Sequence, residues 1–373
     1  MPKLSKSHPK ISIKSTKRTL FWLWHRFASY WQKNIWHKFI VVLAVIILLA
    51  IGTMYGIARW YMYSVRNQPY VMGVTFVPDY AASLGLNPEQ TLSALINDLH
   101  VKNFRFTSYW SDIEPTPGHY DFSELDSEFA QADAAHATVS LSIGLRQPRW
   151  PECHAPSWVD TSAPVNEWQP ELEQFMTAVI NRYKNNPALV SYQLENEYFN
   201  KVFGTCTNYS RSRLVSEYNL VKKLDPNHPI IINRSNNAIG TPLGVPTPDE
   251  FGVSIYRRVW STEIGRYATY PFPAWYYAFL AGVQKIINHK DMVIDELQAE
   301  PWAPNGKTIP EISLNEQNKS LNATSLQERF NFAKATGIRT VYFWGAEYWY
   351  YRLTVEHDPS VWNVAKQNFA KNT

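Results

Sequence analysis

Residues 189–197 read LVSYQLENE, an apolar run that ends in two acids and an amide. A short run of this kind predicts a β-strand over 189–194. Because side chains alternate along a strand, we expect Glu195 and Glu197 to share one side and Asn196 to take the other until the strand ends. The stretch therefore predicts a buried strand with polar groups at its carboxyl end.

Similar runs recur along the chain, separated by helical stretches or long connections. We expect eight strands, at residues 70–77, 103–109, 138–145, 189–194, 229–233, 250–256, 291–295 and 340–344. Strands that alternate with helices indicate a parallel sheet, and eight of them over about 300 residues favour a (β/α)8 TIM barrel, an α/β fold. A doubly wound open sheet is the main alternative, but residues 74–78 lack the glycine-rich phosphate turn often found after its first strand.

Helix boundaries support the alternation. The run 87–90, Asn-Pro-Glu-Gln, combines an N-cap residue with proline in the first turn. Asp121 and Glu124 open a second helix, and a third, at about 322–336, ends before Gly337, a residue suited to a left-handed cap. Each predicted helix lies between two predicted strands, as the barrel requires.

An uncharged run precedes this domain: residues 39–58 read FIVVLAVIILLAIGTMYGIA. As a helix it would span about 30 Å, the thickness of a bilayer's hydrocarbon core. Nine Lys and Arg and no acid come before it. By the positive-inside rule we expect a basic cytoplasmic tail at 1–38, a transmembrane helix at 39–58, a linker at 59–69 and an outer catalytic domain at 70–373.

The uncharged run has two alternative interpretations besides a membrane anchor. A cleaved signal peptide would have a small-residue site near 56–58, but its apolar core is normally about 7–15 residues, shorter than this run. A buried core helix would not explain the one-sided charge. We therefore expect a signal-anchor and a single-pass protein of the cell membrane, with its N-terminus in the cytoplasm and the catalytic domain on the outer face.

Charge and composition exclude several classes of protein. The formal net charge is +4, but residues 1–68 hold eleven of the 36 Lys and Arg and none of the 32 acids, so the rest carries 25 − 32 = −7. An acidic outer domain argues against nucleic acid as a partner, and the basic tail fits a lipid surface instead. The 15 Trp, 22 Tyr and 18 Phe rule out a disordered chain.

Two carboxylates are placed for chemistry at the barrel's rim. Glu197 follows the fourth predicted strand, and Glu296 follows the seventh, in the run DMVIDELQ of residues 291–298. Barrel enzymes carry their active sites at the carboxyl ends of the strands. Glycoside hydrolysis needs two carboxyl groups, one acidic and one ionised, flanking a sugar bond. The pair therefore points to a glycosidase.

The sequence also resembles a known family. Residues 104–122, which contain FRF and WSDIEPTPGHYDF, resemble the second-strand signature of clan A glycoside hydrolases, retaining enzymes that include β-galactosidases, cellulases, mannanases and xylanases. Residues 185–197 are similar to the clan's fourth-strand segment, with its Asn-Glu pair, and residues 249–256 to its sixth strand, which ends in a tyrosine. The DELQ run at 295–298 is similar to the end of the clan's seventh strand, and Trp344 to the aromatic residue of its eighth strand.

The resemblance implies a retaining glycoside hydrolase that cleaves O-glycosidic bonds in an oligo- or polysaccharide by double displacement. Glu197 would be the acid/base and Glu296 the nucleophile, with carboxyls about 5–5.5 Å apart. A non-catalytic carbohydrate-binding protein on the same fold is the alternative, because fold alone does not establish activity. No His/Cys cluster has metal-ligand spacing, and we expect neither a cofactor nor a metal.

Supporting residues follow from the same resemblance. Asn196 would hydrogen-bond the sugar's 2-hydroxyl, and Trp344 would lie under the sugar ring. Arg105 and Tyr256 would keep the nucleophile ionised.

Other rim residues leave choices open. Asp295 and Glu300 compete with Glu296 as the nucleophile, and Glu296 is favoured because it sits just past the apolar run. Glu347 either binds sugar hydroxyls or is a solvated loop acid.

The segment after the third strand also has two interpretations. Arg146, Gln147 and Trp150 either line the sugar site or brace a loop. Cys153 and Cys206 follow the third and fourth strands, which are neighbours in a barrel, so they either form a rim disulfide or remain two thiols.

Overall fold

A computed structural model describes residues 21–235 and 244–371, apart from 23, 27 and 33. The chain divides into two compact units, Met1–Gly56 and Ile57–Thr373. Helix α2 (Ile35–Ser64) has a mean hydropathy of 2.7 over its most apolar 18 residues and is, by length and composition, a candidate membrane span. The helix continues through residues 59–64, part of the stretch expected as a linker.

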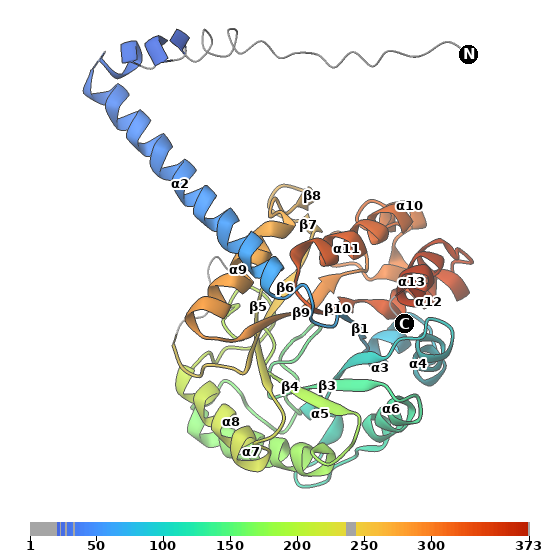
Figure 1. The fold of residues 1–373 in the computed structure, drawn as a ribbon. Helices are drawn as coiled ribbons and strands as arrows, with labels where there is room; N and C mark the ends of the chain where they lie inside the picture. The colour runs from blue at the N-terminus through green and yellow to red at the C-terminus, as the bar shows by residue number, and fades with distance from the viewer. Residues whose placement is uncertain (1–20, 23, 27, 33, 236–243, 372–373) are drawn as a thin grey trace, which may run out of the picture. The chain divides into compact units, whose positions relative to one another are not determined.

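All eight expected strands are present, and they close into a parallel barrel (Figure 1). They are β1 (Val71–Thr75), β2 (Asn103–Thr107), β3 (Thr138–Ile143), β4 (Leu189–Leu194), β5 (Ile230–Ser235), β6 (Glu250–Ile255), β9 (Asp291–Gln298) and β10 (Thr340–Trp344). Closure is direct, because Val71 of β1 pairs with Thr340 of β10 while Val74 pairs with Phe104 of β2. The (β/α)8 prediction is confirmed, and the open sheet is excluded.

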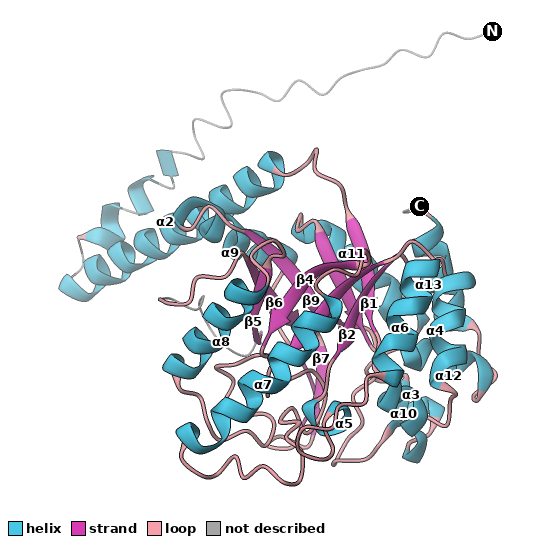
Figure 2. Cartoon of the chain, turned by 90° about the horizontal axis from the view of Figure 1, so that it is seen from below, coloured by secondary structure: helices cyan, strands magenta, loops and turns pink. Residues whose placement is uncertain are grey.

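Helices surround the strands, as Figure 2 shows. The helices of this layer are α3 (Pro78–Ser83), α4 (Pro88–Asn97), α5 (Trp110–Ile113), α6 (Ser123–Ala134), α7 (Val165–Tyr183), α8 (Arg211–Leu224), α9 (Ala274–Ile287), α10 (Leu314–Gln317), α11 (Ala323–Thr336), α12 (Ala346–Thr354) and α13 (Ser360–Ala370), with a 3-10 turn at Ile309–Glu311. An antiparallel hairpin, β7 (Arg258–Ser261) and β8 (Arg266–Thr269), follows β6 and was not expected from the sequence.

Two of the predicted helix boundaries are found, and the third is displaced, because α6 begins at Ser123 with Phe122 rather than Asp121 as its N-cap. Asn87 caps α4, its Oδ1 accepting a hydrogen bond from the Gln90 N–H at 2.8 Å. Asp121 Oδ1 accepts from the Ser123 N–H at 2.9 Å at the start of α6. Gly337 ends α11 with φ 73°, a left-handed conformation that glycine adopts without steric penalty.

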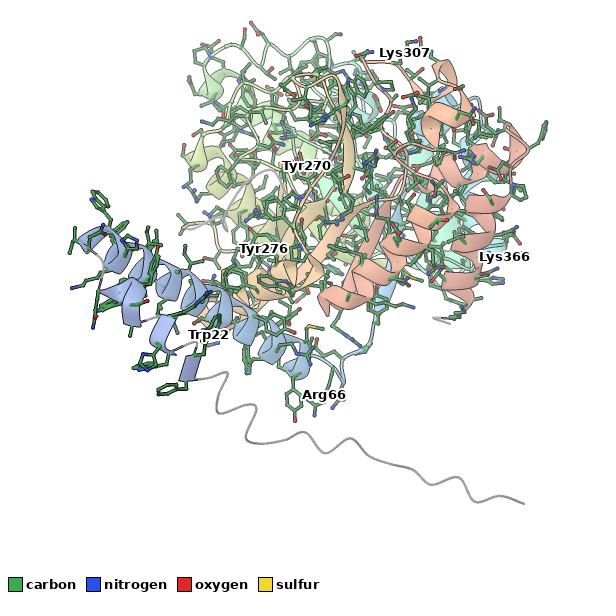
Figure 3. All side chains as sticks on the ribbon, turned by 90° about the horizontal axis from the view of Figure 1, so that it is seen from above. Trp22, Arg66, Tyr270, Tyr276, Lys307 and Lys366 are labelled. Atoms are coloured by element: carbon green, nitrogen blue, oxygen red, sulfur yellow. The ribbon has the colours of Figure 1, made fainter. Side chains whose placement is uncertain are left out.

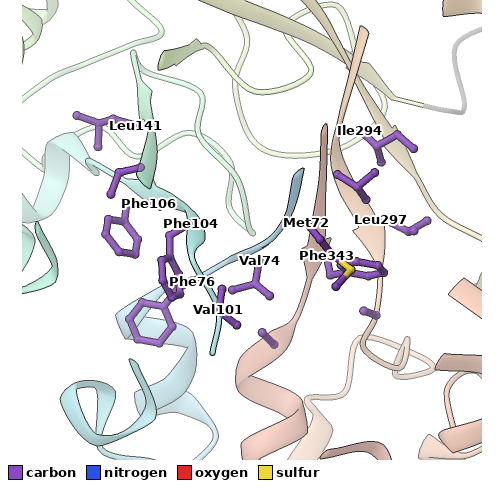
Figure 4. Packing of buried hydrophobic residues seen from close by; sticks show 14 of the residues in the cluster. Met72, Val74, Phe76, Val101, Phe104, Phe106, Leu141, Ile294, Leu297 and Phe343 are labelled. Carbon is purple, nitrogen blue, oxygen red and sulfur yellow. The ribbon is translucent and has the colours of Figure 1, made fainter. Parts of the chain in front are cut away.

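Most of the core lies between the strands and the helices. Figure 4 shows part of this cluster, including residues from β1, β2, β3, β9 and β10: Met72, Val74, Phe104, Phe106, Leu141, Ile294, Leu297 and Phe343. A separate small cluster joins Ile231, Val293 and Tyr342. Polar residues are also buried on the strands, including Thr75, Arg105, Ser140, Gln193 and Asn233.

Aromatic stacking fixes the connection from the hairpin to α9. Tyr270 stacks on Phe272 with ring centroids 6.5 Å apart, and Phe272 stacks on Tyr276 at 4.9 Å. Tyr270 and Tyr276, the two outer residues of this stack, are labelled in Figure 3. These contacts link the end of the β7–β8 hairpin to the start of α9.

Candidate active site

Arg105 of β2 is fully buried and reaches across the barrel to β9. Its Nη2 donates to Glu296 Oε1 at 2.7 Å, and its Nη1 donates to the Asp295 carbonyl oxygen at 2.8 Å. The same Nη1 lies 3.6 Å from Asp295 Oδ2. A single guanidinium therefore contacts two consecutive acids.

An irregularity in β9 makes this double contact geometrically feasible. Adjacent residues on a regular strand point to opposite faces, yet Asp295 and Glu296 both face Arg105. Ile294 pairs with Val253 of β6, whereas Glu296 pairs with Ser254, so one residue of β9 is unmatched at this point. A bulge of this kind re-aims side chains next to it.

Tyr256 supplies a second donor to the Glu296 carboxylate. Its hydroxyl lies 2.7 Å from Glu296 Oε2, so both carboxylate oxygens accept a hydrogen bond. Burial and the adjacent Glu296 charge raise the pKa of Tyr256 well above its ordinary value. The phenol therefore stays protonated and remains a donor.

Strand β4 has the predicted bounds, but the side chains that follow it do not alternate as expected. It ends at Leu194, and the backbone of Glu195 and Glu197 takes left-handed φ values of 54° and 44°. Glu195 faces away from Glu296: it accepts from Arg213 of α8 at 2.9 Å and from the Leu145 N–H at 2.7 Å. The expectation that Glu195 and Glu197 share one side is therefore wrong.

Glu197 is buried, with 5% of its surface exposed, and its carboxyl interacts electrostatically with that of Glu296. Its Oε2 accepts from Asn200 Nδ2 at 2.7 Å, and its backbone N–H donates to Asn233 Oδ1 at 2.6 Å. Oε1 is buried without a hydrogen-bond partner among the described residues. Burial, and next the negative charge of Glu296, raise the pKa of Glu197. Such a carboxyl is suited to donate a proton.

Asn196 is held by three hydrogen bonds. Its Oδ1 accepts from Gln193 Nε2 at 2.9 Å and from Asn233 Nδ2 at 3.0 Å, while its Nδ2 donates to Glu152 Oε2 at 2.9 Å. Sequence reasoning missed Gln193, Asn233 and Glu152. Gln193 and Asn233 carried a usable signal, a polar residue inside an otherwise apolar strand, whereas Glu152 lies in a loop with no such pattern.

Trp344 lies at the end of β10 and is 5% exposed. The Arg149 guanidinium is 4.2 Å from its ring centroid, and the Arg105 guanidinium is 5.6 Å away. Arg149 also pairs with both oxygens of Glu300, at 3.1 and 3.2 Å. Both oxygens of the Glu300 carboxylate are therefore paired with Arg149. The same Arg149 guanidinium contacts the Trp344 ring.

Glu347 is a buried acid and not a solvated one. Its Oε1 accepts from the Val77 N–H at 2.6 Å, and its Oε2 is buried without a partner among the described residues. Burial raises its pKa to about 7, with Arg149 opposing the shift.

The segment after β3 braces its neighbours. Arg146 Nε donates to the Asn196 carbonyl oxygen at 2.6 Å, and Nη2 donates to the Phe203 carbonyl oxygen at 2.9 Å. Gln147 Oε1 accepts from the Ser108 N–H at 2.8 Å. Gln147 therefore fixes the loop to β2, whereas Arg146 reaches the backbone of the candidate site.

Trp150 and the two cysteines lie where the loops after β3 and β4 meet. Trp150 is 63% exposed, and its ring centroid is 5.7 Å from that of Phe203. Cys153 and Cys206 are free cysteines, and the interaction with Cys153, followed by burial, raises the pKa of the Cys206 thiol. Over residues 21–235 and 244–371, with the gaps noted above, no group of three His, Cys, Asp or Glu side chains is arranged to hold a metal ion.

No protein-family model matches the chain. Among solved structures, the β-galactosidase of the Antarctic haloarchaeon Halorubrum lacusprofundi has a TM-score of 0.51 at 11% identity, covering 81% of this chain and 58% of that one. Endo-glycoceramidase II from Rhodococcus sp. has a TM-score of 0.49 at 14% identity, with 74% and 73% covered. The β-galacturonidase from Eisenbergiella tayi has 0.47 at 18%, with 76% and 47% covered.

These neighbours are glycosidases, and at such identities the likeness concerns the fold. The chain shares the (β/α)8 barrel fold with the Halorubrum lacusprofundi β-galactosidase.

Proposed function

We propose that this protein is a membrane-anchored retaining glycoside hydrolase that cleaves O-glycosidic bonds in an oligo- or polysaccharide. The observation that carries the proposal is the pairing of two buried carboxyls. Glu296 is bound by Arg105 and Tyr256, each at 2.7 Å, and burial together with the Glu296 charge raises the pKa of the Glu197 carboxyl. One ionised and one protonated carboxyl is what a retaining glycosidase requires.

In the first step Glu197 donates its proton to the glycosidic oxygen while a Glu296 oxygen attacks the anomeric carbon. The carbon–oxygen bond breaks, the leaving sugar departs as an alcohol, and a glycosyl ester forms on Glu296. In the second step Glu197 takes a proton from water, and the hydroxide displaces Glu296. Two inversions give net retention, which implies that the two carboxyls are about 5–5.5 Å apart.

Asn196 and Trp344 complete the proposed sugar site. The fixed Asn196 amide would bind the 2-hydroxyl, a contact that strengthens in the transition state. Trp344 would lie under the sugar ring, next to Arg149.

Helix α2 would place the barrel at a membrane. Residues 39–58 would span the bilayer, the basic tail 1–38 would stay in the cytoplasm, and the domain 70–373 would act on carbohydrate at the outer face. The positive charge before the span supports this orientation. Full-length protein should remain in the membrane fraction after alkaline carbonate washing, and release by that wash would contradict the anchor.

The test of the activity uses full-length protein in detergent with a panel of 4-nitrophenyl β-glycosides. Glu197→Ala and Glu296→Ala should each lower kcat by a factor of about 10^4 or more, because each removes one of two essential carboxyls. Added azide should restore turnover in both, giving a retained glycosyl azide from E197A and an inverted one from E296A. Glu263→Ala, which removes an exposed acid on the β7–β8 hairpin, is the matched control.

Unchanged turnover in both variants would reject the assignment. Saturable sugar binding without turnover in the wild type would instead establish the non-catalytic carbohydrate-binding protein.

A further inference from the structure

Glu152 is a further carboxyl group at the candidate site. It lies in the loop after β3, whose two ends pair through an antiparallel bridge between Arg146 and Cys153. It is 4% exposed and has a left-handed φ of 69°, which is unusual for a residue with a Cβ. Residues held in such conformations tend to occur where the surrounding structure aims a side chain at a functional site.

Three neighbours fix the Glu152 carboxyl. Its Oε2 accepts from Asn196 Nδ2 at 2.9 Å and lies 3.4 Å from Arg146 Nη2. The backbone of Gly204 approaches so closely that a Cβ on it would lie 2.7 Å from the Glu152 Cβ. The carboxyl therefore has little freedom to turn away from the amide.

The Asn196 amide depends on this contact for its orientation. Gln193 and Asn233 both donate to Oδ1, so the amide oxygen points toward these two side chains. Glu152 takes one of the two Nδ2 hydrogens, which leaves the other available to a ligand. Without Glu152 the Nδ2 group would lose this acceptor, and only the two hydrogen bonds to Oδ1 would hold the amide.

We propose that Glu152 is a positioning residue that holds the Asn196 amide so that its remaining N–H meets the 2-hydroxyl of the sugar. The proposal rests on the proposed function, because it needs a sugar bound at Glu197 and Glu296. Glu152 itself does not touch the reacting atoms.

The charge state of Glu152 is compatible with this role. Burial raises its pKa to about 8, and Arg146 opposes the shift. At neutral pH the group is therefore mainly protonated and adds little negative charge beside Glu296. The hydrogen bond from Asn196 needs only an oxygen acceptor, which the protonated group still offers.

The test compares sugars with and without the 2-hydroxyl in full-length protein: 4-nitrophenyl β-glucoside and β-galactoside, each beside its 2-deoxy counterpart. Glu152→Asp keeps a carboxyl group, but its side chain is one methylene shorter, so the carboxyl lies farther from Asn196. We expect it to lower kcat/KM about tenfold for the 2-hydroxy substrates and less than twofold for the 2-deoxy ones. Glu152→Gln keeps an oxygen acceptor in place and should restore at least half of the lost kcat/KM.

The outcomes separate the two hypotheses. An equal loss on both kinds of substrate, or a loss in Glu152→Gln as large as in Glu152→Asp, would overturn the positioning role while leaving the glycosidase intact. If the wild type hydrolyses and binds none of the substrates, the proposed function fails and the role of Glu152 fails with it. A thermal unfolding midpoint measured for each variant identifies any loss that comes from unfolding.

Discussion

Tyr256 donates its hydroxyl hydrogen to Glu296 across 2.7 Å, joining the end of β6 to the end of β9. Arg105 contacts the other oxygen of the same carboxylate. The candidate nucleophile is therefore oriented by two strands other than its own, and each donor can be removed without touching the carboxylate.

Replacing Tyr256 with Phe should lower kcat about tenfold, because Glu296 keeps its place but loses one neutral donor. Steady-state kinetics on the best aryl glycoside measure the effect. Tyr267→Phe is the control: its hydroxyl contacts Glu316 and the Trp302 carbonyl on the hairpin side, and kcat should stay unchanged. Equal losses in both variants would argue against a specific role for Tyr256.

Replacing Arg105 with Met should destabilise the protein by about 3–5 kcal/mol, because it leaves Glu296 and Asp295 buried without their cation. Arg182→Met breaks an ion pair with Asp126 in which the Arg182 side chain is 45% exposed and the Asp126 side chain 38% exposed. This substitution should change the free energy of unfolding by less than about 1 kcal/mol. Urea denaturation of both variants in detergent provides the comparison. A loss for R105M as small as that for R182M would show that the buried acids do not need the guanidinium.

The rate should fall as the pH rises through the elevated pKa of Glu197, since the first step needs this carboxyl protonated. Burial and the Glu296 charge both raise that pKa, so Glu296→Gln should lower it. Carbon-13 NMR of labelled glutamate carboxyls, with Glu197→Gln to assign the signal, measures the shift directly. A pKa that is unchanged in E296Q would mean that the two carboxyls do not interact.

The adjacent thiols of Cys153 and Cys206 should form a disulfide on treatment with oxidised glutathione, releasing two molecules of glutathione per bond. For a loop of this length the crosslink should stabilise the protein by about 4 kcal/mol. Thiol titration under denaturing conditions and urea denaturation before and after oxidation provide the measurements, with Cys153→Ser as the control. Two titratable thiols after oxidation would rule the bond out.

The barrel can be predicted from the sequence because each of its strands and helices is indicated by residues that are close together in the chain. Alternating apolar runs, the Asn87 cap and the Gly337 terminus each follow from a few neighbouring residues, and all are present. Arg105 and Tyr256 were also expected beside Glu296, on the basis of family resemblance, and the structure brings these three side chains together.

The features that the sequence does not reveal depend on partners far along the chain. The bulge in β9 that turns Asp295 and Glu296 toward one cation is seen only in the pairing with β6. Glu195 leaves its expected side because Arg213 of α8 offers it a buried ion pair. No local pattern indicates that Arg149 would lie on the Trp344 ring.

The pairing of β1 with β10 also determines when the site can exist during synthesis. The proposed residues arrive in the order Arg105, Glu197, Tyr256, Glu296 and Trp344, and the strand that closes the barrel, β10, is the last to be made. Until it emerges, β1 has one open edge and no complete sugar site is present. The ribosome must therefore deliver nearly the whole chain before the proposed hydrolysis could begin, and a chain released before residue 340 would carry most of the proposed catalytic side chains in an unclosed sheet.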